Sequence, residues 1–493
     1  MNLNLETGTV ISLVIYMIAM LAIGYWSFRK TSTLSDYMLA GRGLGPWVTA
    51  LSAGASDMSG WMVMGLPGAL YVTGLSSAWI AIGLSIGAYV NYLVVAPRLR
   101  TYTEIANDSI TIPDFMEYRF ADKSNMLRLV SGIIILIFFT LYVSAGMVSG
   151  GKLFDSAFGF SYHFGVILIA AIVVAYTLFG GFLAVSTTDF VQGCIMFIAL
   201  VVVPFVTIGH IDGGTGAAID LIKSVDPTRL NLFEGATVLG LIGFIAWGLG
   251  YFGQPHIIVR FMAIKSTKEL KAARYINIIW MVIGLMGAMA VGLLGIAFFT
   301  QSGMELADPE TVLIRFADLF FNPFITGFIL AAILAAIMST ISSQLLVTSS
   351  AVTEDFYKTF FRRDASDKEL VLVGRLAVLA VAIAAVLLSI NPNETILNIV
   401  GQAWAGFGSA FGPIVLLSLH WKRMTKWGAL AGMVVGGVTV IVWIVSGLGE
   451  YLYEMVPGFI LSLIAVIIVS ILTEQPGSNV TDQFEEMEKK MAE

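Results

Sequence analysis

Residues 49–65, TALSAGASDMSGWMVMG, form an apolar stretch that is interrupted near its middle by glycines, small polar residues and one acidic residue. Gly54 and Gly60 lie on either side of Asp57. Glycine costs about 1 kcal/mol relative to alanine in a helix interior. The stretch is therefore predicted to be a helix that unwinds close to Asp57.

A second interrupted stretch, AWGLGYFGQPHIIVRF, covers residues 246–261. Its three glycines are followed by Pro255, and proline costs about 3 kcal/mol in a helix interior and removes a backbone hydrogen bond. This stretch is also predicted to unwind. The alternative is that the glycines only allow close packing, as small residues often do between membrane helices.

The composition of the 493-residue chain indicates that both stretches lie in lipid. Apolar residues make up 57% of the chain, and charged residues make up 12%, against about 25% in a soluble domain. This composition excludes soluble enzymes and disordered chains, and a net charge of −6 gives no support to a nucleic-acid partner. The single cysteine, Cys194, excludes disulfides and cysteine metal clusters.

Apolar stretches long enough to cross a bilayer, about 20 residues each, occur thirteen times along the chain. The predicted spans are 8–28, 46–72, 75–98, 127–154, 162–183, 188–209, 235–262, 275–300, 322–355, 370–390, 395–419, 425–446 and 454–473. A cleaved signal peptide requires basic residues before its apolar stretch, and no Lys or Arg precedes the first stretch here. We therefore expect the first stretch to be retained. No soluble segment is large enough for a membrane enzyme or a signalling receptor.

The orientation follows from the basic residues, which are retained on the cytoplasmic side of bacterial membranes. With the N-terminus outside, 23 of the 27 Lys and Arg residues fall in inner segments, including Lys30 and Arg260. The four outer ones are Lys152, Lys223, Arg229 and Arg315. We expect a multi-pass protein of the bacterial plasma membrane, with a cytoplasmic C-terminus and a mobile charged tail.

The interrupted stretches fall in spans two and seven, at matching positions of two groups of five spans. Unwound backbone is tolerated at membrane depth only where it is buried in protein or lines a polar cavity, and such paired breaks indicate an inverted-repeat transporter. The predicted repeats are residues 46–209 and 210–420. Residues 1–45 and 421–493 carry the peripheral first, twelfth and thirteenth spans and the tail.

Asp57 is the candidate ion-coupling residue, because an ionisable group at the bilayer centre costs at least about 2.5–3.5 kcal/mol and is functional by default. Ser56 and Ser59 flank it, and no basic residue is predicted at its depth. A mobile cation or a proton would then supply the missing charge. The alternative is a protonated aspartate that bonds to the neighbouring serines.

Span nine, with ILAAIMSTISSQLLVTSS at 333–350, carries Ser339, Ser343 and Ser350 on one helical face, with Thr340 beside them. A small hard cation prefers oxygen ligands, and hydroxyls and backbone carbonyls make a weak site. Carbonyls freed by the first break are expected at Ala55 and Met58. The alternative is that these hydroxyls bond carbonyls of their own helix.

Five segments resemble the sodium:solute symporter family, and the resemblance extends along nearly the whole chain. They are GRGLGPWVTALSAGASDMSGW at 41–61, YTLFGGFLAVSTTDFVQ at 176–192, AWGLGYFGQPHII at 246–258, ILAAIMSTISSQLLV at 333–347 and AWAGFGSAFGP at 403–413. The resemblance implies an all-α polytopic membrane protein with a leucine-transporter-like five-plus-five inverted repeat. It also implies sodium-coupled uptake of L-proline by alternating access.

The resemblance further implies individual roles. The sodium ligands would be Ala55, Met58, Ala336, Ser339 and Thr340. Asp57 would couple the ion to the substrate, and Asp189 matches an acidic position of the family that lies along the ion's path. The substrate contacts would be Ser59, Gly60, Trp61, Tyr142, Trp247, Tyr251, Gln254 and Pro255. Tyr142, Trp247 and Tyr251 are expected to enclose the proline ring and face its ammonium group, and His256 is interpreted as a helix-end residue.

The rival class is a channel or a sensor on the same scaffold, but the roughly 20 residues after span thirteen cannot form a sensor domain, and a channel would not couple sodium to a substrate. Among transporters, two alternatives stay open. The substrate could be a sugar, a carboxylate or pantothenate, and the coupling ion could be a proton carried by Asp57. The expected co-transported ion is Na+, and the expected partners are L-proline and the lipid bilayer. No enzyme activity, nucleic acid or obligate protein partner is expected.

Overall fold

The computed structural model describes residues 6–29, 38–179, 181–234, 236–391 and 394–492, and its regular structure there is helical apart from one isolated bridge between Leu44 and Ile264. The helices that cross or cap the bundle are α1 (Thr7–Phe28), α3 (Pro46–Asp57), α4 (Leu66–Thr73), α5 (Ala78–Val94), α6 (Ala96–Ile105), α7 (Ile112–Arg119), α8 (Met126–Phe158), α9 (Tyr162–Phe179), α10 (Phe182–Gly209), α11 (Gly214–Val225), α12 (Val238–Ala246), α13 (Pro255–Ala263), α14 (Leu270–Ser302), α15 (Val312–Phe320), α16 (Pro323–Ser350), α17 (Asp367–Ser389), α18 (Ile396–His420), α19 (Lys426–Val445), α20 (Met455–Leu472) and α21 (Ser478–Ala492). Short π-helical or 3₁₀ segments include η2 (Trp61–Gly65), η5 (Trp247–Gly253), η7 (Pro309–Thr311) and η8 (Ala351–Phe361).

The protein is an all-helical polytopic membrane protein. Among the described residues, ten helices are long and apolar enough to cross a bilayer, or eleven if the bent pair Val238–Gly253 and Pro255–Ala263 counts as one span. This count is lower than the thirteen predicted spans for two reasons. Predicted spans two and three merge in Trp61–Val94, and the apolar part of α9, Tyr162–Leu178, falls short of a full span.

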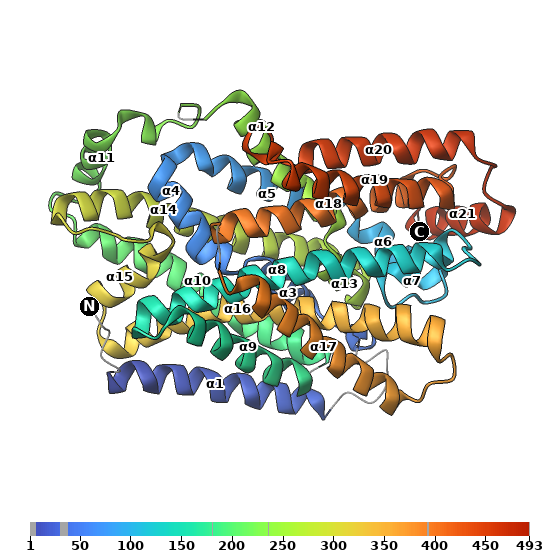
Figure 1. The fold of residues 1–493 in the computed structure, drawn as a ribbon, viewed down its shortest axis with the longest axis horizontal. Helices are drawn as coiled ribbons and strands as arrows, with labels where there is room; N and C mark the ends of the chain where they lie inside the picture. The colour runs from blue at the N-terminus through green and yellow to red at the C-terminus, as the bar shows by residue number, and fades with distance from the viewer. Residues whose placement is uncertain (1–5, 30–37, 180, 235, 392–393, 493) are drawn as a thin grey trace.

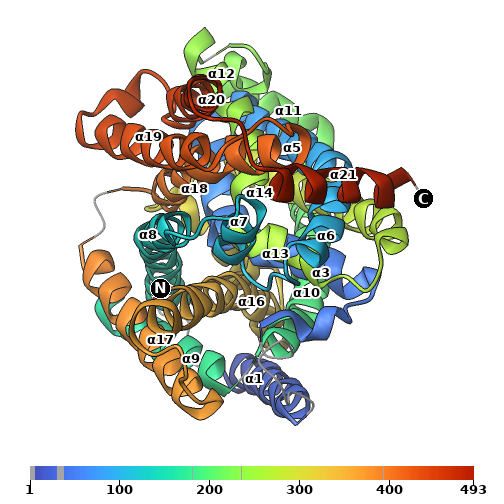
Figure 2. The same cartoon turned by 90° about the vertical axis from the view of Figure 1, so that its right-hand side faces the viewer.

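The long helices run side by side along the long axis of the molecule (Figure 1). Viewed end-on, α3, α10, α13 and α16 gather near the centre, with α1, α9 and α17 on one side and α19 and α20 on the other (Figure 2). The most apolar windows of α16 and α18 are each 83% buried, whereas that of α1 is 22% buried. The serine-rich helix α16 therefore lies inside protein, whereas most of α1 is exposed at the edge of the bundle.

The prediction of a mobile C-terminal tail is wrong for the part of the tail that forms α21. Val480, Phe484 and Met487 are buried, and the guanidinium of Arg119 lies 5.4 Å from the centroid of the Phe484 ring. This apolar face packs against α6 at the end of the bundle that also carries α7 (Figure 1). The charged residues of the tail thus occupy one face of an amphipathic helix, and the other face docks.

Candidate functional site

The first break lies between α3 and η2 and involves only residues 58–60. The backbone of Met58 leaves helical geometry (φ −76°, ψ 73°), and the N–H of Ser59 donates to the carbonyl of Asp57 at 2.8 Å instead of reaching Ala55. A Cβ on Gly60 would lie 2.6 Å from Cβ of Ser149 in α8. The predicted unwinding is therefore present. Gly60 also permits a close contact with α8, so this glycine serves close helix packing as well as the break.

The second break is longer. After α12 the chain forms the 3₁₀ segment η5, and Gln254 is extended (φ −84°, ψ 106°). Pro255 begins α13, which is bent by 44° relative to the preceding helical stretch Val238–Gly253. Proline is tolerated here because the first turn of a helix needs no N–H donor. Gly250 again serves packing, since a Cβ there would lie 2.6 Å from Cδ1 of Trp404 in α18.

The carbonyl of Ala55 has partners on α16 rather than on its own helix. The hydroxyls of Ser339 and Thr340 donate to it at 2.8 and 3.4 Å, and Ser339 also lies 3.2 Å from the carbonyl of Ala336. Ala55 belongs to α3 and is not unwound, but the break beyond it removes the donor that Ser59 would supply. Four of the five predicted sodium ligands are thereby gathered at one place, with Met58 at the adjoining break.

Asp57 lies beside this group and is 1% exposed. Its carboxylate accepts a hydrogen bond from the hydroxyl of Tyr251 in η5, and its Oδ1 has no hydrogen-bond partner within the described chain. Its carbonyl accepts from the indole of Trp61 at 2.9 Å and from the hydroxyl of Tyr142 at 3.4 Å. One residue thus joins the first break to the second break and to α8.

The neighbouring serines do not bond the Asp57 carboxylate. The hydroxyl of Ser56 donates to the carbonyl of Ala53 at 3.2 Å, and Ser59 Oγ accepts from the N–H of Trp61 at 3.3 Å. The alternative that adjacent serines satisfy this aspartate is therefore wrong. The hydroxyl that reaches the carboxylate comes from Tyr251, nearly 200 residues away in sequence.

Aromatic rings form a wall around the second break. The Trp247 ring stacks on Tyr453 at 5.5 Å and on Trp404 at 6.5 Å, and it meets Trp61 at 6.1 Å. Trp247 and Tyr453 also line a cavity of about 580 Å³ that opens between α12, α18 and the α19–α20 loop. The wall therefore separates this vestibule from Asp57.

Sequence reasoning missed Trp404 and Tyr453. Trp404 lies within the matched segment 403–413, and the one tryptophan of this segment, among small residues and two phenylalanines, was the available signal. The predicted Gln254 donates from Nε2 to the carbonyl of Trp404 at 3.0 Å, which leaves Oε1 without a partner among the described residues. Pro255 follows directly and is buried.

Asp189 is not isolated, because it pairs with Arg260. The two side chains are fully buried, with Arg260 Nη2 3.2 Å from Asp189 Oδ2. Ser52 donates to the same oxygen at 2.8 Å, and Arg260 Nη2 donates to Ser343 Oγ at 2.7 Å. The cluster joins α3, α10, α13 and α16.

Arg260, which the count of basic residues assigned to an inner segment, lies within a helix and not in a loop. α13 continues to Ala263, so position 260 lies inside a helix whose neighbours are protein. Counting basic residues by loop could not detect a cation that is neutralised by an aspartate 71 positions away. Lys30, which belongs to the same count, lies outside the described residues.

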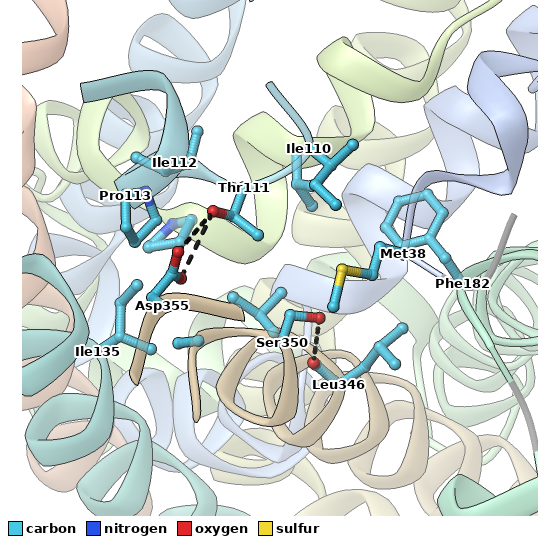
Figure 3. Close-up of a pocket in the computed structure, with 14 residues that line it drawn as sticks. Met38, Ile110, Thr111, Ile112, Pro113, Ile135, Phe182, Leu346, Ser350 and Asp355 are labelled. Carbon is cyan, nitrogen blue, oxygen red and sulfur yellow. Dashed lines mark hydrogen bonds between the residues drawn. The ribbon is translucent and has the colours of Figure 1, made fainter. Parts of the chain in front are cut away.

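A far smaller cavity lies at the opposite end of the second break. It measures about 20 Å³, enough for about one water molecule, and it is lined by residues that include Pro255, Phe182 and Ser350 (Figure 3). Asp355 borders it and accepts hydrogen bonds from Thr111 and from Arg128 Nη1, both at 3.2 Å. The cavity beside Pro255 is thus far smaller than the vestibule that Trp247 lines.

Two predicted features have a local explanation. The hydroxyl of Ser350 donates to the carbonyl of Leu346 in its own helix at 3.0 Å, as the alternative for the serine stripe anticipated (Figure 3). His256 is the second residue of α13 and is fully buried, with its ring 5.8 Å from that of Tyr142. Neither ring nitrogen has a hydrogen-bond partner in the described part of the chain.

A helical bundle in which two helices break inside protein, around a buried carboxylate, has the architecture of a secondary transporter. The sodium:solute symporter family model matches residues 37–436, and the chain belongs to that family. It is a transporter and not an enzyme.

Curated relatives match over nearly their full length. The high-affinity proline transporter PutP of Bacillus subtilis is 63% identical over 474 residues, covering 96% of this chain and 100% of that protein. The sodium/proline symporter 2 of Staphylococcus saprophyticus is 56% identical, with 98% and 97% covered.

Solved structures agree on the fold at low sequence identity. A Na⁺-coupled sialic acid symporter, in a substrate-bound outward-open state, is 21% identical with a TM-score of 0.81, and the match covers 96% of this chain and 100% of that one. MhsT in complex with L-phenylalanine is 15% identical with a TM-score of 0.53 over 86% and 97%. The fold is thus shared with structurally characterised transporters.

Proposed function

We propose that the chain is a sodium-coupled L-proline symporter that works by alternating access. Its close relatives are named as proline transporters and sodium/proline symporters, at 55–63% identity over nearly the whole chain. The observation that carries the proposal is the buried carboxylate of Asp57, which contacts the second break through Tyr251 and lies two residues from the carbonyl that α16 binds. Asp57 would therefore lie next to both the sodium ion and the proline.

Sodium, a co-substrate rather than a cofactor, would bind between α3 and α16. The proposed ligands are the carbonyls of Ala55, Met58 and Ala336 and the hydroxyls of Ser339 and Thr340. The hydroxyl-to-carbonyl distances of 2.8 to 3.4 Å support this set, because a small movement would let an ion replace the hydrogen bonds. Asp57 would balance the charge of the ion.

Proline would bind between the two breaks. Trp61, Tyr142, Trp247 and Tyr251 would enclose its ring and ammonium group, and Ser59, Gly60, Gln254 and Pro255 would provide polar and backbone contacts. The support is the burial of all eight residues and the free Oε1 of Gln254, which can accept from the ammonium. The start of α13 would attract the carboxylate through the helix dipole.

The proposed topology has thirteen spans, with inverted repeats at 46–209 and 210–420 and peripheral parts at 1–45 and 421–493. Helical segments coincide with all thirteen predicted stretches, which supports the topology. The cytoplasmic end would be the one that carries α6, α7 and α21 (Figure 1), since the basic residues of α6 and α7 gather there.

In the transport cycle, sodium would order the first break and thereby the substrate site, so each ligand would tighten binding of the other. The wide vestibule at Trp247 and the much smaller cavity beside Pro255 fit a protein that receives its ligands from outside. Asp189, with Arg260, would lie on the path by which the ion leaves. The sodium gradient and the membrane potential, worth about 2.3 kcal/mol per charge at 100 mV, would supply the work.

The test is uptake of radiolabelled L-proline into proteoliposomes under an inward sodium gradient, with potassium and proton gradients as controls and unlabelled solutes as competitors. Sodium-driven, proline-selective accumulation is expected. Sodium-driven uptake of another solute would overturn the substrate, and proton-driven uptake would overturn the ion. Flux of sodium without any coupled solute would indicate a channel.

A further inference from the structure

Trp404, in α18, contacts both ends of the second break. Its indole N–H donates to the carbonyl of Trp247, the first residue of η5, at 2.8 Å. Its own carbonyl accepts from the side chain of Gln254, directly after η5, at 3.0 Å. A single residue that is 1% exposed thus spans the whole seven-residue segment from another helix.

The ring of Trp404 also determines where the middle of the segment can lie. It meets the Tyr251 ring edge-on at 5.2 Å, and it approaches Gly250 so closely that no side chain fits there. A 3₁₀ segment has poorer internal hydrogen bonds than an α-helix and depends more on outside partners for its shape. The contacts of Trp404 are partners of this kind.

We propose that Trp404 is a positioning residue for substrate selection, which holds η5 in the conformation that presents Trp247 and Tyr251 to the substrate. The proposal rests on the proposed function and deepens it. Because Trp404 contacts both ends of η5 and the Tyr251 ring, it fixes the separation of the Trp247 and Tyr251 rings, and it thereby sets the size of cyclic amino acid that fits between them. Sodium binding, on the far side of Asp57, depends on Trp404 only indirectly.

The experiment compares Trp404→Phe and Trp404→Leu with wild type in proteoliposomes. Phenylalanine keeps a ring and loses the indole donor, and leucine loses both. The matched control is Trp79→Phe, because the indole of Trp79 donates to the carbonyl of Leu232 at 2.9 Å, across a similar separation in sequence but outside the site. For each variant, KM for proline, the maximal rate, the sodium concentration for half-maximal uptake and the melting temperature are measured.

For Trp404→Phe we expect KM for proline to rise about tenfold, the usual effect of one lost buried hydrogen bond, with the sodium response changed less than about threefold. Discrimination between four-, five- and six-membered ring imino acids should weaken, and Trp404→Leu should weaken it further. Trp79→Phe should resemble wild type.

Unchanged KM and ring selectivity in Trp404→Phe would overturn the inference. A lower melting temperature together with an equal loss in every transport parameter would also overturn it, because the variant would then only be less well folded. Wild-type protein without sodium-driven proline uptake would instead refute the proposed function. The two failures are therefore distinct.

Discussion

The two breaks use the same device for different chemistry. The first involves residues 58–60 and frees a backbone carbonyl that hydroxyls of α16 bind. The second extends over η5 and Gln254 and is held by aromatic rings and one amide. The short break presents oxygen atoms, which suits the proposed sodium site, whereas the long break presents ring faces, which suits the apolar ring of the proposed substrate.

The breaks are also tied to each other at two depths. Tyr251 of the second break bonds Asp57 of the first, and Arg260 of α13 bonds Ser52 of α3 at 3.0 Å. A movement of one broken helix against the other would therefore have to break or shift these hydrogen bonds. This comparison predicts that substitutions at the first break affect sodium, and that substitutions at the ties affect both ligands or the fold.

The largest effect is expected from Asp57→Ala. Removing the buried charge that is proposed to balance the ion should abolish uptake or raise the half-maximal sodium concentration at least about 100-fold, because breaking a buried charge pair costs about 3–5 kcal/mol. The measurement is proline uptake against sodium concentration. Asp220→Ala, which removes the same group from the exposed side of α11, is the control. Sodium dependence like that of wild type in Asp57→Ala would refute the ion assignment.

Arg260→Met tests the deeper tie. It leaves Asp189 buried without its partner, so the protein should lose about 3–5 kcal/mol of stability, read from thermal unfolding in detergent. Adding Asp189→Leu removes the second charge and should restore much of the melting temperature. A stable single variant, or a double variant less stable than the single, would show that the pair does not hold α10 to α13.

The existence and place of both breaks could be predicted from the sequence because glycine and proline act locally. The positions of Gly60, Gly250 and Pro255 within apolar stretches were enough to indicate unwinding. The partners could not be predicted from local signals. Nothing near Asp57 in sequence indicates that its hydroxyl donor is Tyr251, or that Arg260 neutralises Asp189.

The count of spans shows the same limit in another form. Hydropathy marks apolar stretches and separates predicted spans two and three between residues 72 and 75, but it does not show that Trp61–Val94 forms one continuous helical run in the structure. Amphipathic segments were harder to predict than apolar ones. The sequence of α21 was interpreted as a mobile tail, although Phe484 and Met487 are buried where this helix packs against the bundle. Contacts that depend on tertiary packing leave no periodic signal in a chain that is apolar nearly throughout.

The double variant Ser339→Ala with Thr340→Ala tests the short break alone. Loss of both hydroxyls should raise the half-maximal sodium concentration about tenfold, or about 1.4 kcal/mol, as expected for one or two lost polar contacts. Proline affinity at saturating sodium should change much less, because these hydroxyls contact Ala55 and not η5. If proline affinity falls as far as the sodium response, the assignment of sodium to the first break and of the substrate to the second is wrong.

The smallest effect is expected from Ser350→Ala, on the same face of α16 as Ser339 and Ser343. The hydroxyl of Ser350 bonds the Leu346 carbonyl of its own helix, which is already part of the helical ladder, so uptake and stability should stay within about twofold and about 0.5 kcal/mol of wild type. Ser343→Ala is the matched variant, since it removes the 2.7 Å contact with Arg260 and should be more harmful. The three serines share one helical periodicity and differ in their partners. Equal losses of uptake and stability in both variants would mean that the position of a serine on this face of α16 decides its importance. The expected difference would mean that its hydrogen-bond partner on a neighbouring helix decides it.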